Sequence, residues 1–378
     1  MTSRILLLGL LLALLTAPVG ASSIIPAAPA IAAKGYLLMD FHSGQVLAEE
    51  NADAPLEPAS LTKIMTAYVV FHELAQGNIA LDDEVLVSEK AWRMPGSRMF
   101  IEVNNRVSVE DLLKGMIIQS GNDASVALAE HVAGGEDAFA LLMNNHARQL
   151  GMNHSNFLNS TGLPQADHIT TARDMALLAR ALIERFPEYY GWYSERSFTY
   201  NGITQHNRNR LLWRDESVDG FKTGHTNAAG YCLVASGQRG DMRLISVLLG
   251  AANENARAAE SHKLLNYGFR FFETHRLYAA NEALTDIRIW RGAAETLPVG
   301  LTEPLYITVP RGQYDNLKAT MAIDGQIVAP TEKGREHGFV HVTLGDRELA
   351  SRPLVALDDV GEGGLWQRLV DNVKLMFQ

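Results

Sequence analysis

The 378-residue chain is 47% hydrophobic and 20% charged, the balance of an ordinary globular protein long enough for two domains. Its net charge of −10 gives no electrostatic support to a nucleic-acid partner, so we expect no nucleic-acid binding. The single cysteine, Cys232, excludes an internal disulfide; because its neighbours are apolar, we expect an inert core thiol.

Residues 1–21 have the pattern of a secretory signal. Arg4 precedes an apolar run over residues 5–15, and small residues follow up to Ala21, where we expect cleavage. The apolar run is short for a membrane span, although an uncleaved anchor is the alternative. The pattern predicts export of the rest of the chain.

The next segments predict an α+β domain over residues 22–274. A β-hairpin is expected at 35–48, and a buried helix begins at Ser60 after Pro58. Short strands and loops fill 78–107. The later elements are helices at 108–118, 122–132, 136–150 and 171–186, then strands at 218–225, 230–236 and 242–250, then a helix at 254–274. The three late strands suggest an antiparallel sheet shared with the hairpin, with the last helix packed on it.

Residues 275–355 predict a small all-β domain. Short alternating segments at 286–290, 305–309, 319–323 and 339–344 are separated by Gly, Pro and Asp turns. His337 and His341 are interpreted as surface histidines, and neither a metal site nor a cofactor is expected.

Residues 356–378 predict a linker and an amphipathic helix. Gly361 to Gly364 suggest a flexible joint. A helix of the remaining residues would reach ~21 Å, short of the ~30 Å hydrocarbon core, so it would lie in the membrane interface. The alternative is docking on its own protein or on a partner. The apolar side chains of this helix are Trp366, Leu369, Val370, Val373, Met376 and Phe377.

Ser60 and Lys63 form the first candidate catalytic pair. They are three residues apart at a helix start, so both side chains lie on one face. A serine is a good nucleophile only when a base takes its proton, and a lysine can do so when burial lowers its pKa from about 10.4. Alone, the pair is more typical of a helix cap beside a solvated lysine.

Two further motifs supply polar groups. Ser120-Gly121-Asn122 falls between two predicted helices, where a hydroxyl and an amide can point into a cleft, although such residues are also common in turns. Residues 222–224, Lys-Thr-Gly, fall on a predicted strand and precede His225. Lysine and threonine suit an anionic group, and the glycine admits a ligand backbone at the strand edge.

Together, S-x-x-K, S-x-N and K-T-G in this order form the signature of penicillin-recognising serine hydrolases. Gly121 replaces the Asp of class A β-lactamases. The chain closely resembles D-alanyl-D-alanine carboxypeptidases, the low-molecular-weight penicillin-binding proteins, over most of residues 34–375. The longer stretches that carry the resemblance are 58–63, 120–125, 218–226 and 264–274.

The resemblance implies a β-lactamase/transpeptidase-like domain and a catalytic set. Ser60 would attack the carbonyl between the two terminal D-alanines of a peptidoglycan stem peptide. Lys63, held neutral by Lys222 and its surroundings, would take the Ser60 proton. Ser120 would pass that proton to the leaving D-alanine, and Asn122 would position Lys63 and the substrate amide.

The resemblance also implies a substrate-binding set. Lys222 and Thr223 would bind the terminal carboxylate, and the backbone N–H groups of Ser60 and His225 would form the oxyanion hole. Arg257 would assist, and Arg208 would brace the region, with a structural ion pair as an equal alternative. The full substrate-binding set is Lys222, Thr223, Gly224, His225, Arg208 and Arg257.

β-Lactam antibiotics are expected to acylate Ser60 and leave slowly. The expected location is the periplasmic face of the cytoplasmic (inner) membrane, with peripheral anchoring through the C-terminal helix. A D,D-endopeptidase, a β-lactamase and a non-catalytic wall-binding protein remain alternatives. A zinc peptidase is not favoured, because Gln76 stands where the second histidine of H-E-x-x-H belongs.

Overall fold

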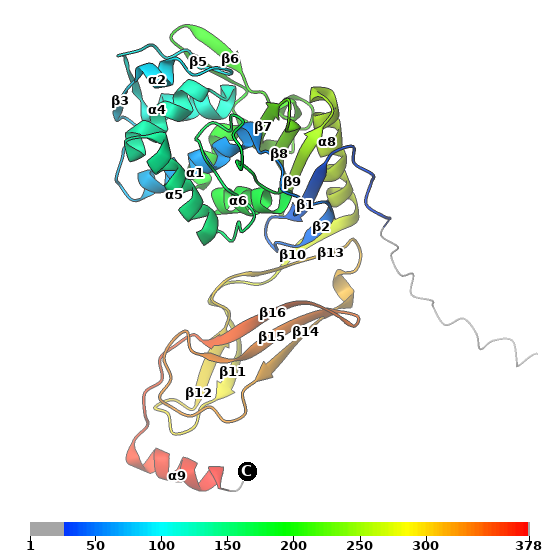
Figure 1. The fold of residues 1–378 in the computed structure, drawn as a ribbon. Coiled ribbons are helices and arrows are strands. Elements are labelled where there is room, and N and C mark those ends of the chain that lie inside the picture. The colour runs from blue at the N-terminus through cyan, green and yellow to red at the C-terminus, as the bar shows by residue number, and fades with distance from the viewer. Residues whose placement is uncertain (1–25, 377–378) are drawn as a thin grey trace, which may run out of the picture.

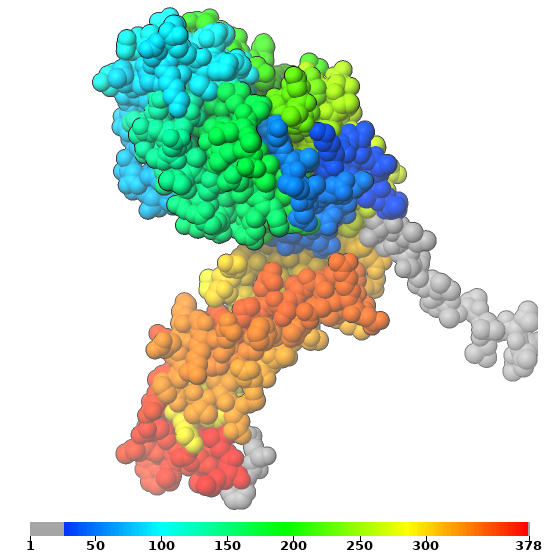
Figure 2. Space-filling model, viewed as in Figure 1, coloured from blue at the N-terminus to red at the C-terminus, as the bar shows by residue number. Residues whose placement is uncertain are grey.

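The computed structural model describes residues 26–376. The predicted signal segment, 1–21, and Phe377 therefore lie outside the described residues. Figures 1 and 2 show a large N-terminal lobe, a narrower β domain attached below it and a terminal helix at the far end of that domain.

A five-stranded antiparallel sheet organises the large lobe. Its order is β2-β1-β9-β8-β7, so the N-terminal hairpin shares a sheet with the late meander, as predicted. Strand β7 lies at the edge of the sheet and carries the Lys-Thr-Gly motif. The strands are β1 (Gly35–Asp40), β2 (Val46–Glu50), β7 (Val218–Thr226), β8 (Gly230–Arg239) and β9 (Met242–Ala251).

Helices cover both faces of this sheet (Figure 1). Side chains alternate along the strands, so one face packs on α8 (Glu254–Phe271) and the other on α1 (Thr62–Ala75) and α6 (Ala172–Arg185). The prediction that α8 runs to Thr274 is wrong. The helix ends at Phe271 because the following residues, which include the buried Phe272, begin strand β10 (Phe272–Tyr278).

The α-rich part of the lobe confirms the other predicted helices. Ser108 and Thr171 cap two of them by accepting hydrogen bonds from the N–H groups of Asp111 and Asp174. The helix expected over 108–118 divides into α3 and a π-helical turn, η2. The remaining helical elements are η1 (Ala59–Leu61), α2 (Glu89–Trp92), α3 (Val109–Lys114), η2 (Gly115–Gln119), α4 (Asn122–Ala133), α5 (Glu136–Gln149), α7 (Pro187–Tyr190), η3 (Gly191–Ser194) and η4 (Arg210–Trp213). Two small hairpins pair β3 (Glu84–Leu86) with β4 (Arg106–Ser108) and β5 (Ser197–Tyr200) with β6 (Ile203–His206).

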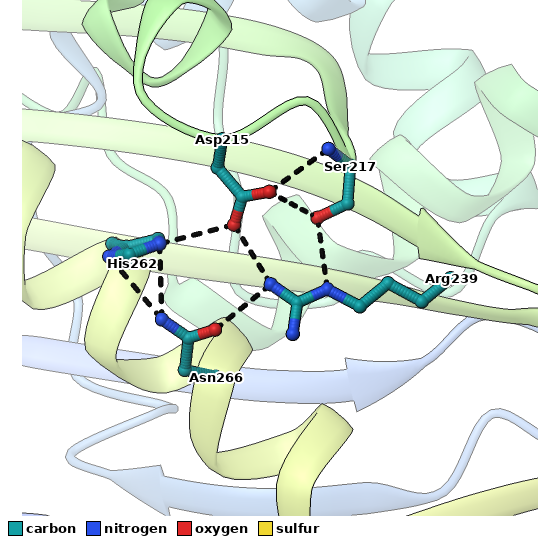
Figure 3. A network of polar contacts seen from close by, with 5 residues as sticks. All are labelled: Asp215, Ser217, Arg239, His262 and Asn266. Atoms are coloured by element: carbon teal, nitrogen blue, oxygen red, sulfur yellow. Dashed lines mark hydrogen bonds and ion pairs between the residues drawn. The ribbon is translucent and has the colours of Figure 1, made fainter.

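A polar network fixes the start of β7 against α8 (Figure 3). The Asp215 carboxylate accepts hydrogen bonds from the Ser217 amide and hydroxyl, at 2.9 and 2.6 Å. Its other oxygen lies 3.0 Å from Arg239 Nη2 on β8 and 3.1 Å from His262 Nε2 on α8. Asn266, one turn further along α8, accepts from the same guanidinium. Because β7 and α8 both carry predicted site residues, this network supports the geometry of the site.

The β domain contains two sheets. Strand β10 pairs with β13, and a five-stranded antiparallel sheet has the order β11-β12-β16-β15-β14. The interpretation of His337 as a surface residue is wrong, since it is 6% exposed and lies 2.7 Å from Thr331 Oγ1. The strands are β11 (Ala283–Arg288), β12 (Thr296–Gly300), β13 (Leu305–Pro310), β14 (Leu317–Ile323), β15 (Glu336–Leu344) and β16 (Arg347–Ala356), with a turn η5 (Tyr314–Asn316).

A buried carboxylate joins the two lobes. Asp40, at the end of β1, is fully buried and accepts a 2.6 Å hydrogen bond from the Thr274 hydroxyl of β10. Its second oxygen accepts from the amide and hydroxyl of Ser43, and that hydroxyl lies 2.7 Å from Thr308 Oγ1 on β13. The junction is therefore held by polar groups that satisfy one another.

Helix α9 (Leu365–Leu375) packs on the far end of the β domain. The buried Asp371 accepts a 2.7 Å hydrogen bond from the Arg291 amide. The prediction of a flexible joint at residues 361–364 is wrong, because backbone hydrogen bonds hold this segment. Ala293 N donates to Gly361 O, and Gly363 N donates to Arg291 O. No helix within residues 26–376 is both long and apolar enough to cross a membrane. Exposed apolar side chains of this segment are Leu365, Trp366, Leu369, Val370, Val373 and Met376.

Candidate active site

Ser60 lies in a tight turn between two close backbone neighbours. It belongs to η1, directly before α1, so the predicted helix start is a 3₁₀ turn at this residue. A Cβ on Gly224 of β7 would lie 3.1 Å from the Ser60 amide nitrogen, and one on Gly162 would clash with the carbonyl of Ala59. Gly162 also has a φ of +81°, which favours glycine. These two glycines let β7 and the loop at Gly162 approach the candidate nucleophile.

Lys63 lies beneath Ser60 and is 1% exposed. Its Nζ is 3.2 Å from Ser60 Oγ, 2.7 Å from Asn122 Oδ1 and 2.6 Å from the Thr161 carbonyl oxygen. Burial, and then the positive charge of Arg208, lower the pKa of Lys63 to about 7. Arg208 is a cation that the sequence prediction for Lys63 did not include. The charges of Lys63 and Lys222 also disfavour each other, because the same repulsion lowers the pKa of Lys222.

These distances orient the amine when it is neutral. A neutral amine has two N–H groups and one lone pair. The two carbonyl oxygens, of Asn122 and Thr161, can only accept hydrogen bonds, so each accepts one from an N–H group of the amine. The lone pair then faces Ser60 Oγ, which is the arrangement a general base needs.

The second motif places an unpaired hydroxyl in the pocket that Ser60 also lines. Ser120 ends the π-helical turn with a left-handed φ of 69°, and its buried Oγ has no hydrogen-bond partner within residues 26–376. Asn122, at the start of α4, donates a 2.6 Å hydrogen bond to the Pro95 carbonyl while it accepts from Lys63. The unpaired Ser120 hydroxyl is therefore available to a bound molecule.

Asp123 shapes the loop that precedes this motif. Its carboxylate is 1% exposed and accepts hydrogen bonds from the amides of Met99 and Phe100, at 3.0 and 2.9 Å. The amide of Ile101 lies 3.4 Å away. This carboxylate fixes the backbone next to Ser97, which lines the pocket.

A polar pocket of about 270 Å³ lies above these groups. Lys222 on β7 is 2% exposed, and burial, followed by the charge of Lys63, holds its pKa well below its usual range. Burial also lowers the pKa of Arg208 and of Arg257. Four basic side chains thus gather in a largely buried environment, which favours a bound anion because an anion stabilises their charged forms. The pocket is lined by Ser60, Ser97, Ser120, Arg208, Thr223, Gly224, His225, Tyr231, Glu254 and Arg257.

The structure brings the sequence-predicted residues together. Seven of them line the pocket, Lys63 and Asn122 lie behind Ser60, and Lys222 is buried on the adjacent strand. Arg208 forms no ion pair with a carboxylate in the described part of the chain, whereas Arg257 lies 3.3 Å from Glu254. Within residues 26–376 no group of His, Cys, Asp and Glu side chains could hold a metal ion.

Sequence reasoning missed Thr161 and Asp123. Thr161 acts through its backbone carbonyl, which no residue-type pattern reveals. Asn159 holds that turn, since its Oδ1 accepts from the amides of Thr161 and Gly162. The turn-forming run Asn-Ser-Thr-Gly at 159–162 is the available signal. Asp123 directly follows Ser-Gly-Asn, but nothing in the sequence shows that it bonds to a loop over twenty residues away.

Comparison with known proteins identifies this arrangement. The family model of D-alanyl-D-alanine carboxypeptidases matches residues 22–253, and the model of the C-terminal domain of penicillin-binding protein 5 matches residues 272–362. The chain belongs to the D-alanyl-D-alanine carboxypeptidase family. The family resemblance predicted from the three motifs is confirmed.

Relatives match almost the whole chain. The D-alanyl-D-alanine carboxypeptidase DacC of Escherichia coli K12 is 47% identical, over 93% of this chain and 90% of that protein. DacA of the same organism is 41% identical, over 94% and 90%. The crystal structure of penicillin-binding protein 5 from Haemophilus influenzae superposes with a TM-score of 0.86 at 42% identity, covering 89% of this chain and all of that one.

The family assignment confirms the predicted fold class and activity. The large lobe is a transpeptidase-like domain, and an all-β domain and a short helix follow it. The activity of the family is that of a serine-type D-alanyl-D-alanine carboxypeptidase. The non-catalytic alternative is not favoured, since the Ser60 and Lys63 pair is intact.

Proposed function

We propose that this carboxypeptidase removes the terminal D-alanine of peptidoglycan stem pentapeptides through an acyl-enzyme on Ser60. One observation carries the proposal: the Lys63 amine, 3.2 Å from Ser60 Oγ, gives its N–H groups to two carbonyl oxygens and keeps its lone pair for the serine proton. With a pKa of about 7, Lys63 is substantially neutral near neutral pH.

Acylation follows from these positions. Ser60 Oγ attacks the D-alanyl carbonyl carbon as its proton moves to Lys63, and the carbonyl oxygen becomes an oxyanion. The backbone N–H groups of Ser60 and His225 stabilise that oxyanion; one such donor contributes ~10²–10³ in rate. The unpaired Ser120 hydroxyl relays the proton from Lys63 to the departing D-alanine nitrogen as the C–N bond breaks, so Lys63 returns to its neutral form. Asn122 holds Lys63 and the substrate amide.

The cationic pocket selects a substrate that ends in a carboxylate. Lys222 and Thr223 bind this group, Gly224 lets the substrate backbone lie along the edge of β7, and Arg208 and Arg257 add positive charge. A bound carboxylate favours the charged form of the buried Lys222, so carboxylate binding offsets the desolvation that lowers its pKa. Ending the substrate in an amide would remove this interaction.

Water then hydrolyses the ester on Ser60 and restores the enzyme. A β-lactam presents a strained amide beside a carboxylate, so we infer that it acylates Ser60 in the same way and is released slowly. Penicillin-binding protein D2 of Listeria monocytogenes, 31% identical over 63% of this chain and 98% of that one, has been solved with ampicillin bound (TM-score 0.59).

Mass spectrometry after incubation with a fluorescent penicillin tests this mechanism. We expect one adduct, on Ser60, and D-alanine release from a pentapeptide. Ser60→Ala should lose both, while Ser194→Ala, an exposed control, keeps both. A Ser60→Ala protein that is still labelled would refute the nucleophile assignment. Rapid drug turnover would indicate a β-lactamase, and faster cleavage of a cross-linked dimer would indicate an endopeptidase.

Export and peripheral anchoring complete the proposal. Residues 1–21 direct export, residues 22–274 and 275–355 form the peptidase and β domains, and 356–378 attach the enzyme to the periplasmic face of the inner membrane. The exposed apolar side chains of α9, such as Trp366 and Leu369, support this anchor. Deleting residues 361–378 should give a soluble, active enzyme; a truncated protein that stays with the membrane fraction would contradict the anchor.

A further inference from the structure

A second cationic cavity lies beside α9, far from the active site. Its volume is about 310 Å³, and it opens between the β domain and the start of the helix. Two arginines, Arg291 from the β domain and Arg368 from α9, line it. Leu365 and Leu369, which belong to the exposed apolar face of α9, form another part of its wall.

The Arg291 side chain is left without a partner in this cavity. Its Nε is buried and has no hydrogen bond within residues 26–376, and its guanidinium forms no ion pair with any carboxylate there. Its backbone is held on both sides, by Asp371 Oδ2 at 2.7 Å and by Gly363 N at 2.7 Å. Burial of an unpaired guanidinium nitrogen is costly, and the Arg291 side chain as a whole is only partly buried, so its terminal nitrogens are open to an acceptor from outside.

The start of α9 adds hydrogen-bond donors. Gly364 provides no side-chain cap, so the first N–H groups of the helix have no side-chain acceptor. The 11-residue helix also directs the positive end of its dipole here. Glu362 pairs with Arg368, which leaves Arg291 as the uncompensated charge.

We propose that this cavity binds the phosphate of an anionic phospholipid headgroup. The inference rests on the proposed anchor, because the apolar face of α9 would place the cavity at headgroup depth while its side chains enter the acyl region. A planar guanidinium can hold two phosphate oxygens at once, which gives Arg291 a role that a lysine cannot fill.

Vesicle co-sedimentation of the full-length mature chain tests the proposal. Two vesicle types are compared: phosphatidylcholine alone, and phosphatidylcholine mixed with phosphatidylglycerol. A basic residue near an anionic surface contributes about 1 kcal/mol without any specific site, or roughly fivefold in affinity. We expect Arg291→Gln to reduce the affinity for the mixed vesicles by more than this factor and to leave the affinity for the phosphatidylcholine vesicles unchanged. Arg291→Lys should recover only part of the lost affinity.

Two controls separate the site from general effects. Arg352→Gln, an exposed arginine on β16, should bind both vesicle types like the wild type. D-Alanine release should be unchanged in every variant, which verifies the fold. Arg368→Gln should weaken binding less than Arg291→Gln, because Glu362 already pairs with Arg368.

The possible failures are distinguishable. If the wild type binds neither vesicle, the anchor is wrong and the headgroup site with it. If it binds both types equally and Arg291→Gln has no effect, the anchor stands and the site is wrong. If inorganic phosphate binds as tightly as the mixed vesicles and displaces them, the site takes free phosphate, and the lipid assignment is overturned.

Discussion

Helices α1 and α9 are both rich in apolar residues, yet their environments are opposite. Ten of the fourteen residues of α1 are buried, while the one buried residue of α9 is Asp371. In α1 the sheet and other helices cover the apolar side chains, and Lys63 is buried with them. In α9 the polar side faces the β domain, and the apolar side faces outward.

Each helix buries one side chain of a charged residue type, Lys63 in α1 and Asp371 in α9, and burial has a different consequence for each. For Lys63, burial lowers the pKa of the amine to about 7 and so turns it into a base. For Asp371, two donors satisfy the carboxylate, the Arg291 amide at 2.7 Å and Arg288 Nη2 at 3.3 Å, so burial fixes an orientation. The first helix is organised for chemistry and the second for attachment.

Replacing Lys63 gives the largest expected effect. Lys63→Met removes the base, so the kcat/KM for D-alanine release should fall by about 10²–10⁴-fold. In the wild type the neutral amine is the active form, so kcat/KM should rise as the pH increases through about 7 and level off above it. A pH–rate profile measures both. Lys318→Met, an exposed lysine of β14, should match the wild type. A wild-type kcat/KM that stays constant between pH 5 and pH 9 would show that burial does not bring the pKa of Lys63 into this range.

Asp123→Asn is expected to have an intermediate effect. The variant loses a charged acceptor of the Met99 and Phe100 amides, so the free energy of unfolding should fall by about 1–3 kcal/mol. The displaced loop should lower the rate of penicillin acylation by about ten- to a hundredfold.

The pH profile of this variant separates electrostatics from loop movement. The negative charge of Asp123 raises the pKa of Lys63, so its removal should shift the midpoint of kcat/KM below that of the wild type. Asp82→Asn, with an exposed carboxylate, serves as the control. An unchanged midpoint with a lower rate would mean that Asp123 acts only by holding the loop.

Much of the fold followed from the sequence, because caps and alternation are local signals. Ser108 and Thr171 begin helices as their residue types predict. Strand β16 escaped prediction because Arg352 and Pro353 interrupt its alternation. Its apolar end, residues 354–356, is recognised as part of a strand only because the structure pairs it with β12. The end of α8 was misplaced because Phe272 continues an aromatic run that fits either a helix or a strand.

The site was predictable where a side chain carries the chemistry. Ser60, Lys63 and Lys222 have the residue types that the reaction requires, and the motif order linked them. The Thr161 carbonyl and the Asp123 carboxylate act on atoms distant along the chain, so their roles appear only in three dimensions. The contribution of Arg208 to the lowered pKa of Lys63 was not predicted for the same reason, since sequence spacing does not show that the two side chains interact.

The smallest expected effect is confined to α9. Asp371→Ala removes the acceptor of Arg291 N and Arg288, so docking of the helix should weaken by about 1–3 kcal/mol. Hydrogen exchange should become faster over residues 365–375, while the large lobe, its melting temperature and D-alanine release stay unchanged. Asp358→Ala, an exposed carboxylate near the same end of the β domain, should leave exchange in α9 unaltered. Faster exchange in α1 as well would show that the two helices are coupled through the Asp40 junction, and the division between chemistry and attachment would then be wrong.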